Sequence, residues 1–371
     1  MAVLNDFQSM VMDTARDWVR DRMPVKAFRA VRDGGDKRGF DAAAWAEIGE
    51  LGWGGIAIPE AHGGSGLGYL TLGLIVEQMG RTLGATPLPV SAVAAEALVL
   101  GGMGAVCLAW LPRLLSGEAV GALAVDEHPR HGPETIATTA VKTADGWRLD
   151  GIKRFVAEGM GADLLIVAAR ADDGIALFAV DVTSQGVSRT ARRLTDSRGH
   201  ADVVLSGVTV AAEARLSHPD GDAILLEALL DRARALTAAE LLGLSVGAFE
   251  TTLEYLKTRE QFGQKIGAFQ ALQHRAAELY TRIELTRSAV EAALHAIDME
   301  APDRALLVSM AKATAGDTAN LATREMIQMH GGIGMTDEHD AGFYIKRSRV
   351  MEAAWGSAAW HRERFGQRIG V

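Results

Sequence analysis

The sequence predicts a mainly α-helical protein with a small β domain in its middle. Apolar residues recur at three- and four-residue spacing in the first and last parts of the chain, and at every second residue between them. The 371 residues suffice for two or three domains, and 48% hydrophobic with 23% charged residues is ordinary globular usage. We therefore expect an N-terminal helical domain at 1–117, a β domain at 118–217 and a C-terminal helical bundle at 218–371.

The first zone shows helical spacing in DFQSMVMDTARDWV and again in TLGLIVEQMGRTL. Between these runs lies the glycine cluster HGGSGLG at 62–68, which superficially offers a phosphate-binding turn. A dinucleotide fingerprint also needs a second strand ending in an acidic residue about 20 positions on, and a helical run follows instead. The cluster therefore favours a tight structural turn over nicotinamide binding.

The middle zone alternates with a period of two in ADLLIVAAR, GIALFAVDV and ADVVLSGVTV. Asp-Gly turns stand at 145–146 and 173–174, where hairpins would reverse the chain. Short strands at this spacing predict a small antiparallel sandwich or barrel.

The last zone returns to long amphipathic runs at about 222–258, 268–299, 303–330 and 347–365. Long helices with short connections usually pack as an antiparallel bundle, so we expect a C-terminal four-helix bundle.

Several function classes are disfavoured by composition. The net charge of −9 argues against a nucleic-acid partner, and no stretch of about 18 uninterrupted apolar residues predicts a membrane span or a signal peptide. The lone Cys107 cannot form an internal disulfide, and a reducing cytoplasm fits. The segments DEHPRH at 126–131 and DEHD at 337–340 lack metal-ligand spacing, so we expect solvated loops and no metal site.

A corner of the last zone combines a cation with amide donors. Arg259 and Gln261 stand beside Phe262 and Gly263 at an expected helix end, which suits a pyrophosphate or another anion. A basic helix C-terminus that offsets the helix dipole is the structural alternative.

Three motifs in order now carry a family resemblance. IPEAHGGSGLG, TREQFGQKIGAFQALQH and REMIQMHGGIGMTDEHD resemble the acyl-CoA dehydrogenase family of flavoproteins, over essentially the whole chain. The resemblance implies FAD bound between the β domain and the C-terminal helices, with a neighbouring subunit completing the site. It places the following residues at the adenosine-pyrophosphate side of FAD: Arg259, Gln261, Phe262, Phe269, Gln270, Gln328, Gly331 and Gly332.

The resemblance also implies contacts to the flavin ring and to CoA. In GIKRFVAEG, Phe155 matches the family's aromatic and Ala157 its hydroxyl position, so Phe155, Val156 and Ala157 form the expected flavin contact. The hydroxyl is lost, although a backbone N–H at Ala157 would still serve. The family's Thr-Glu-Pro and Gly-Ser-Asp loop becomes VDEHPRHG, which carries over no side-chain contacts.

Asp231 and Arg234 match an Asp-x-x-Arg pair that lies near CoA in the family. A simple ion pair at i, i+3 is the alternative interpretation.

The catalytic base of the family is missing. A Glu usually precedes the flavin-facing Gly-Thr/Ser pair, but this chain has Trp355 before Gly356 and Ser357, and the base position used by some relatives holds Ala233. Glu240 shares a helical face with Ala233 and is the tentative base, whereas Glu352 is a weaker candidate. The structural alternatives for Glu240 are an ion pair with a basic residue on an adjacent helix or a capping hydrogen bond at the end of the bundle.

These features lead to two hypotheses. The first is an FAD-dependent acyl-CoA dehydrogenase that converts an acyl-CoA thioester to a trans-2-enoyl-CoA and passes electrons to an electron-transferring flavoprotein, as a homotetramer or as one subunit of a heterotetramer like the steroid-type enzymes. The second is a non-catalytic subunit that completes an FAD site. Oxidase chemistry stays open.

Overall fold

The computed structural model describes residues 4–102 and 104–371. The chain forms two compact units, each built from segments that are distant in sequence. One unit comprises Arg29–Gly68 and Ala85–Ala233, and the other comprises Met1–Phe28, Tyr69–Gly84 and Arg234–Val371. Helices α2 and α7 each contribute residues to both units. The predicted domain boundaries at 117 and 217 stay a prediction, since this grouping follows packing rather than chain order.

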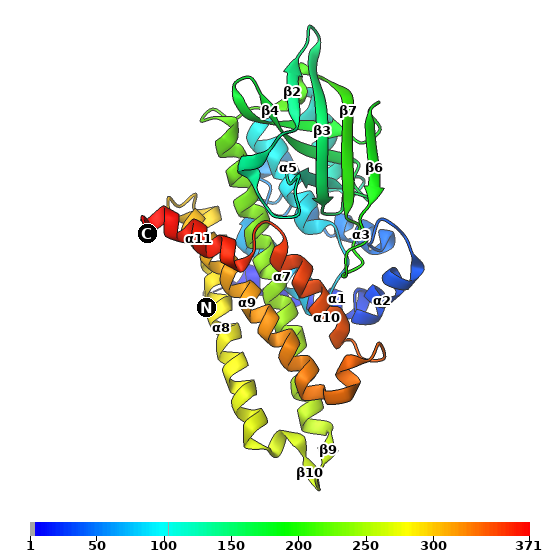
Figure 1. The fold of residues 1–371 in the computed structure, drawn as a ribbon, viewed down its shortest axis with the longest axis vertical. Helices are drawn as coiled ribbons and strands as arrows, with labels where there is room; N and C mark the ends of the chain where they lie inside the picture. Colours follow the sequence, from blue (N-terminus) through cyan, green and yellow to red (C-terminus); the bar gives the residue numbers. More distant parts are fainter. Residues whose placement is uncertain (1–3, 103) are drawn as a thin grey trace. The chain divides into compact units, whose positions relative to one another are not determined.

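The first unit, which we call the sheet unit, contains short helices and the β-strands (Figure 1). Its helices are most of α2 (Val25–Gly34), α3 (Ala42–Glu50), α5 (Leu88–Gly101), α6 (Ala105–Leu115) and the start of α7 (Asp222–Thr258). Its strands are β1 (Gly121–Ala124), β2 (Thr139–Lys142), β3 (Gly146–Val156), β4 (Leu164–Ala171), β5 (Gly174–Asp181), β6 (Val187–Ala191), β7 (Ala201–Ala211) and β8 (Arg215–Leu216).

These strands form one mixed sheet in the order β6-β7-β3-β2-β4-β5-β8, with β1 attached to β4. The pairs β2 with β3 and β4 with β5 are antiparallel, as the Asp-Gly turns at 145–146 and 173–174 predict. The pair β3 with β7 is antiparallel as well. The expected small β domain is confirmed, but its sheet is mixed rather than antiparallel throughout, because β1 and β2 each pair with β4 in parallel. Helix α5 packs on β1 and covers it, so this strand is fully buried.

The sheet buries one contiguous apolar core, in which Leu165, Phe178 and Val203 are fully buried. Lys153 of β3 is also fully buried, and its Nζ donates to Glu127 Oε1 at 2.7 Å and to the Val125 carbonyl at 3.1 Å. Burial alone would raise the pKa of Glu127, but hydrogen bonds from Lys153 and Thr138 outweigh it and hold that pKa at about 2. This pair fixes the segment after β1 to β3.

The second unit, which we call the helical unit, contains the long helices and a small hairpin (Figure 1). Its elements are α1 (Asp6–Arg22), α4 (Gly68–Arg81), most of α7, β9 (Glu260–Gln261), β10 (Gln264–Lys265), α8 (Gln270–Asp298), α9 (Arg304–His330), α10 (Ala341–Ala353) and α11 (Ala358–Ile369). Helix α9 packs against α8, α10 and α11. The single helix predicted at 347–365 is wrong: a turn at 354–357 separates α10 from α11, where Trp355 and Gly356 both have positive φ.

Helices α4 and α7 approach each other closely through glycines. A Cβ atom on Gly243 would stand 1.9 Å from the Glu77 carbonyl oxygen, and one on Gly247 would stand 2.1 Å from that of Arg81. Arg81 also pairs with Glu250 at 2.6 Å across the same two helices. The backbones therefore touch only because these α7 positions lack side chains.

We expect Gly243→Ala to destabilise the protein by about 2–4 kcal/mol, because the methyl group must push one helix backbone away from the other. Chemical denaturation followed by circular dichroism measures this change. Gly342→Ala on α10 is the matched control, since no atom lies within 4 Å of its added methyl group. That control should be neutral or slightly stabilising. An equal loss of stability in both variants would contradict the proposed close contact between the α4 and α7 backbones.

Among the residues that the structure describes, no helix has the length and apolar character needed to cross a membrane.

Candidate functional site

The predicted flavin contact lies where β3 ends. Phe155 has φ of +53°, and its N–H donates to Asp202 Oδ1 on β7 at 3.3 Å. Arg192 donates to the other oxygen of Asp202 at 2.7 Å, and its guanidinium lies 5.9 Å from the centre of the Phe155 ring. Burial would raise the pKa of Asp202, but the bonds from Arg192 and Phe155 outweigh it and lower that pKa. Asp202 thus fixes an unusual backbone conformation at this aromatic.

The next two residues offer backbone rather than side-chain chemistry. Val156 is buried, whereas Ala157 is half-buried and stands in the turn after β3. Within residues 4–102 and 104–371, the Ala157 N–H donates to no other protein group. This donor therefore remains available where the sequence lacks a hydroxyl.

The loop VDEHPRHG is closed by a hydrogen bond between His131 and Asp126. His131 Nδ1 lies 2.9 Å from Asp126 Oδ1, and only 2% of the His131 side chain is exposed. The expectation of a fully solvated loop is wrong at His131, because the carboxylate of Asp126 draws the imidazole inward. Arg154 N–H donates to the Asp126 carbonyl at 2.7 Å, which ties this loop to β3 beside Phe155. Within the described part of the chain, no group of three or more His, Cys, Asp or Glu is arranged to hold a metal ion.

The predicted adenosine-pyrophosphate contacts gather at two neighbouring places in the helical unit. The first is the β9–β10 hairpin beyond the ends of α7 and α8 (Figure 1), where Phe262 is 90% exposed at φ of +55°. Its ring meets that of Phe269 edge-on at 6.1 Å. Arg259, Gln261 and Gln270 are exposed around this pair. A large aromatic left in solvent beside polar donors is typical of a contact that another molecule completes.

The second place is the end of α9. Gln328, Gly331 and Gly332 are exposed, and a Cβ on either glycine would meet no atom within 4 Å. His330 is buried against the ring of Tyr255 at 4.3 Å, and Tyr255 lies in α7 one turn before Arg259. The fold therefore brings the residues of the two sequence motifs together at one end of the helical unit.

The turn between α10 and α11 is held at several backbone carbonyls. Trp355 is 8% exposed at φ of +57°, and its carbonyl accepts from Arg234 Nε at 3.3 Å and from His361 Nε2 at 3.1 Å. Lys312 Nζ donates to the carbonyls of Glu352 and Gly356, at 3.0 Å in each case. A Cβ on Gly356 would stand 2.5 Å from the Trp360 ring, so this position requires glycine.

The polar side chains of the same turn are engaged within the protein. Ser357 Oγ caps α11 by accepting from the Trp360 N–H at 3.3 Å. Glu352 Oε1 accepts from the Ala358 N–H at 2.9 Å. Both contacts shape the turn, and the predicted flavin roles of Gly356 and Ser357 stay predictions.

The expected base Glu240 pairs with a neighbouring helix. Both Nε and Nη2 of Arg347, on α10, donate to Glu240 Oε1 at 3.1 and 2.7 Å. Glu240 is 8% exposed and so is Trp355. Glu240 therefore forms the ion pair that the sequence analysis gave as one structural alternative. A catalytic role for Glu240 stays a prediction.

The two residues of the Asp-x-x-Arg motif are both buried, with Asp231 1% and Arg234 0% exposed. The Arg234 guanidinium lies 4.9 Å from the Trp360 ring centre, in addition to its bond to the Trp355 carbonyl. Their contact with CoA stays a prediction from the family resemblance.

Three basic residues of this region were missed by the sequence reasoning: Lys312, His361 and Arg364. Burial lowers the pKa of Lys312 to about 7, with a further decrease from Arg234 and an opposing increase from Glu352. Burial and the charges of Lys312, Arg234 and Arg364 lower the pKa of His361 to about 2. The only sequence signal is a lone lysine in the apolar run VSMAKATAG.

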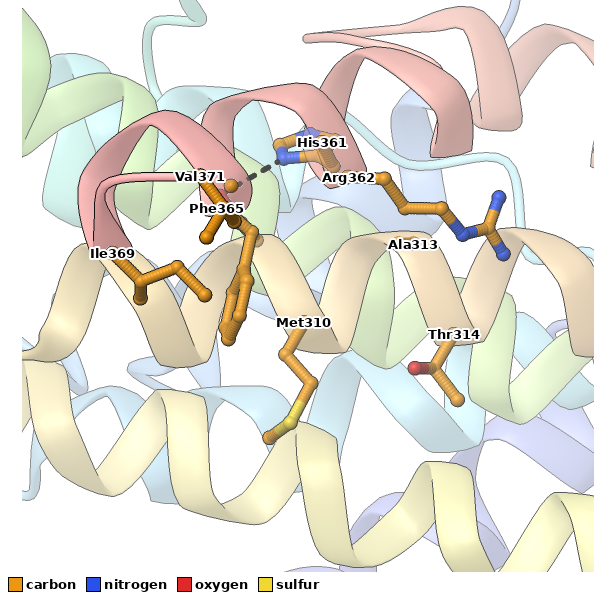
Figure 2. A pocket seen from close by; sticks show the side chains of 10 residues that line it. Met310, Ala313, Thr314, His361, Arg362, Phe365, Ile369 and Val371 are labelled. Carbon is orange, nitrogen blue, oxygen red and sulfur yellow. Dashed lines mark hydrogen bonds between the residues drawn. The ribbon is translucent and has the colours of Figure 1, made fainter.

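A cavity of about 430 Å³ lies between α9 and α11 (Figure 2). Met310 of α9 and Phe365 of α11 point into it, and His361 is one of the residues that line it. None of the predicted site residues lines it.

Comparison with known proteins decides the family. Sequence models described as the acyl-CoA dehydrogenase N-terminal and C-terminal domains match residues 5–118 and 220–370. The mitochondrial isovaleryl-CoA dehydrogenase of Pongo abelii is 31% identical, over 99% of this chain and 90% of the relative. The chain belongs to the acyl-CoA dehydrogenase family.

Two solved structures of this family resemble the whole chain. One is a variant of the Tcur3481-Tcur3483 steroid ACAD, with 32% identity, a TM-score of 0.90 and 98% coverage of both chains. The other is the ChsE4-ChsE5 complex from Mycobacterium tuberculosis, with 27% identity, a TM-score of 0.91 and coverage of 100% of this chain and 99% of the other. The resemblance and the fold expected from it are confirmed.

FAD is the cofactor of acyl-CoA dehydrogenases, and the residues of this chain fit it. The open donor at Ala157 suits a flavin edge, and the exposed Phe262 with Arg259 and Gln261 suits an adenosine pyrophosphate presented by another subunit. The uncovered backbone at Gly331 and Gly332 allows a close approach beside them. These residues would hold FAD, which supplies the hydride acceptor of the reaction.

Proposed function

We propose that this chain is a subunit of an FAD-dependent, hetero-oligomeric acyl-CoA dehydrogenase in which a homologous subunit supplies the carboxylate base. The reaction is α,β-dehydrogenation of an acyl-CoA thioester to a trans-2-enoyl-CoA, with an electron-transferring flavoprotein as the acceptor. The chain contributes flavin and adenosine-pyrophosphate contacts. The observation that carries this proposal is Trp355, which stands where the family places its base.

Proton removal from the α-carbon needs a group that can accept a proton within hydrogen-bonding reach. The indole of Trp355 has only an N–H donor, and Ala233 has no polar side-chain atom. Glu240 is held toward α10 by two N–H donors of Arg347, and Glu352 is bonded to the Ala358 N–H. The carboxylates near the turn are therefore committed to contacts within the helical unit.

Both solved structures described above carry the names of two proteins, and this supports a hetero-oligomer here. The exposed Phe262 hairpin also supports an assembly, since a large exposed aromatic beside polar donors suits a contact with another subunit. The loss of the base would then be tolerated, because the partner's acyl site keeps its own carboxylate.

The proposal is tested by expressing the chain alone and with a homologue that has Glu before its Gly-Thr/Ser pair. We expect acyl-CoA-dependent reduction of an artificial electron acceptor only in the co-purified complex. Flavin absorbance of each preparation shows whether FAD is bound. If the flavin-containing homomer turned over at the rate of the complex, this chain would have its own base and the proposal would be refuted.

The second candidate is a chain that uses Glu240 as its own base, which its position on the face of Ala233 favours. The variant Glu240→Gln separates the two. We expect the Gln variant of the complex to keep kcat within about threefold, because under our proposal the carboxylate only pairs with Arg347. It should lose about 1–3 kcal/mol of stability, because the charged partner Arg347 stays buried.

Arg347→Gln is the matched control for that variant, because it breaks the same ion pair from the other side. Both variants should lose similar stability and keep turnover. A fall in kcat of about a thousandfold or more in Glu240→Gln alone would instead assign the base to Glu240.

A further inference from the structure

Three buried basic side chains converge on the turn between α10 and α11 from three different helices. Arg234 comes from α7, Lys312 from α9 and His361 from α11, and each is 0% exposed. Together they donate to the carbonyls of Glu352, Trp355 and Gly356. Such convergence is uncommon, because burying basic groups is costly unless their hydrogen bonds are satisfied.

His361 is the member whose hydrogen bonds have a defined direction. The carbonyl of Trp355 can only accept, so His361 Nε2 carries the proton of the 3.1 Å contact. The guanidinium of Arg364 can only donate, so Ser309 Oγ accepts its Nη1–H at 2.6 Å. The Ser309 hydroxyl proton is then directed to His361 Nδ1, 3.3 Å away.

This chain of bonds fixes a neutral imidazole in one tautomer. The lowered pKa of His361 agrees with that state, since burial and the surrounding cations Lys312, Arg234 and Arg364 oppose a further charge. The charge of Glu352 opposes the lowering of the pKa of Lys312, and the Glu352 side chain accepts a hydrogen bond from the Ala358 N–H.

The backbone at Trp355, whose carbonyl accepts the hydrogen bond from His361, is conformationally strained. Trp355 has φ of +57°, a region that bulky residues rarely occupy because their side chains clash with the backbone there. Such a conformation persists only where surrounding contacts fix it, and the carbonyl of Trp355 receives two of them. The direction of this carbonyl sets the orientation of the peptide unit that begins Gly356.

We propose that His361 is a positioning residue that orients the Trp355–Ser357 turn toward the bound flavin, through a hydrogen-bond chain that begins at Arg364 and Ser309. The assignment of this turn to the flavin rests on the proposed function. His361 itself touches neither cofactor nor substrate in this role. Its effect passes through the Trp355 carbonyl.

Two amide variants of the full chain separate positioning from packing. The amide nitrogen of Gln superimposes on Nε2 and keeps the donor to Trp355, whereas the amide of Asn reaches only the position of Nδ1. We expect His361→Asn to raise the amide exchange of a peptide covering 353–358 by about tenfold, the change that corresponds to the loss of one such bond. We expect His361→Gln to exchange like the wild type, and His295→Leu on the exposed side of α8 to be silent.

A second readout uses the complex with its homologous subunit. The midpoint potential of the bound flavin should shift in His361→Asn and return to the wild-type value in His361→Gln. Ser309→Ala removes only the hydroxyl that orients the ring, and should give a smaller shift in the same direction if His361→Asn fails to fold.

Equal exchange and equal potential in the Asn, Gln and wild-type proteins would overturn the proposal, as would equal damage in the Asn and Gln variants. Amide exchange is measured on the chain alone, without turnover or partner. If exchange responds as expected but the wild-type complex does not dehydrogenate any acyl-CoA, the proposed function fails and the positioning role of His361 within the turn stands.

Discussion

Trp355→Glu is expected to give the isolated, FAD-loaded chain an acyl-CoA-dependent reduction of an artificial acceptor, at least about tenfold above the wild-type background. The substitution places a carboxylate directly before Gly356, where the sequence motif predicts the base of the family. The buried Arg234 donates to the carbonyl of residue 355 itself, and the buried Lys312 donates to the carbonyls of Glu352 and Gly356. Their positive charges would favour the ionised form of a carboxyl group at position 355, which is the form that can accept a proton.

Trp355→Gln is the matched control, because it has nearly the same shape as the Glu variant but cannot accept a proton. Both should lose about 3–5 kcal/mol of stability from the removal of a largely buried indole, so FAD content and melting temperature must be compared first. Equal activity in the Gln variant would mean that space rather than a base was missing. A flavin-loaded Glu variant that stays inactive would contradict the role assigned to this position.

Stability should rise with pH across the whole range in which Lys312 and His361 titrate. The pKa of Lys312 is lowered from 10.5 to about 7, so between these values the unfolded chain binds one more proton than the folded chain. The pKa of His361 is lowered from 6.5 to about 2, which has the same sign between pH 2 and pH 6.5. Each group then contributes a slope of about 1.4 kcal/mol per pH unit within its window.

Urea denaturation at pH 5, 6, 7, 8 and 9 measures these slopes. We expect the unfolding free energy to fall by about 2 kcal/mol from His361 between pH 6.5 and 5, and by a similar amount from Lys312 between pH 9 and 7.5. His361→Gln should flatten the acid part of the curve, and Lys312→Met should flatten the alkaline part. Unchanged slopes in both variants would show that other groups control the pH dependence.

The sequence predicted the features that depend on local pattern. Helices at 222–258, 268–299 and 303–330 agree with α7, α8 and α9 to within two residues at each end, because apolar spacing directly reflects which face of a helix is buried. The break at 354–357 was missed, because Trp355 adopts a positive φ that no propensity favours. The parallel pairing of β1 with β4 was missed as well, since alternation is the same for parallel and antiparallel neighbours.

The sequence by itself indicated the family, and it predicts that the family's two base positions fall on Trp355 and Ala233, neither of which carries a carboxylate. Only the tertiary structure decided which side chains surround these positions. It paired Glu240 with Arg347, and it brought Arg234, Lys312 and His361 to one turn. Motifs are recognised along the chain, whereas hydrogen bonds, burial and the resulting pKa values depend on residues that are distant in sequence. Glu240 and Arg347 are 107 positions apart, and Arg234 and Trp355 are 121 positions apart. These residues meet only when the helices pack.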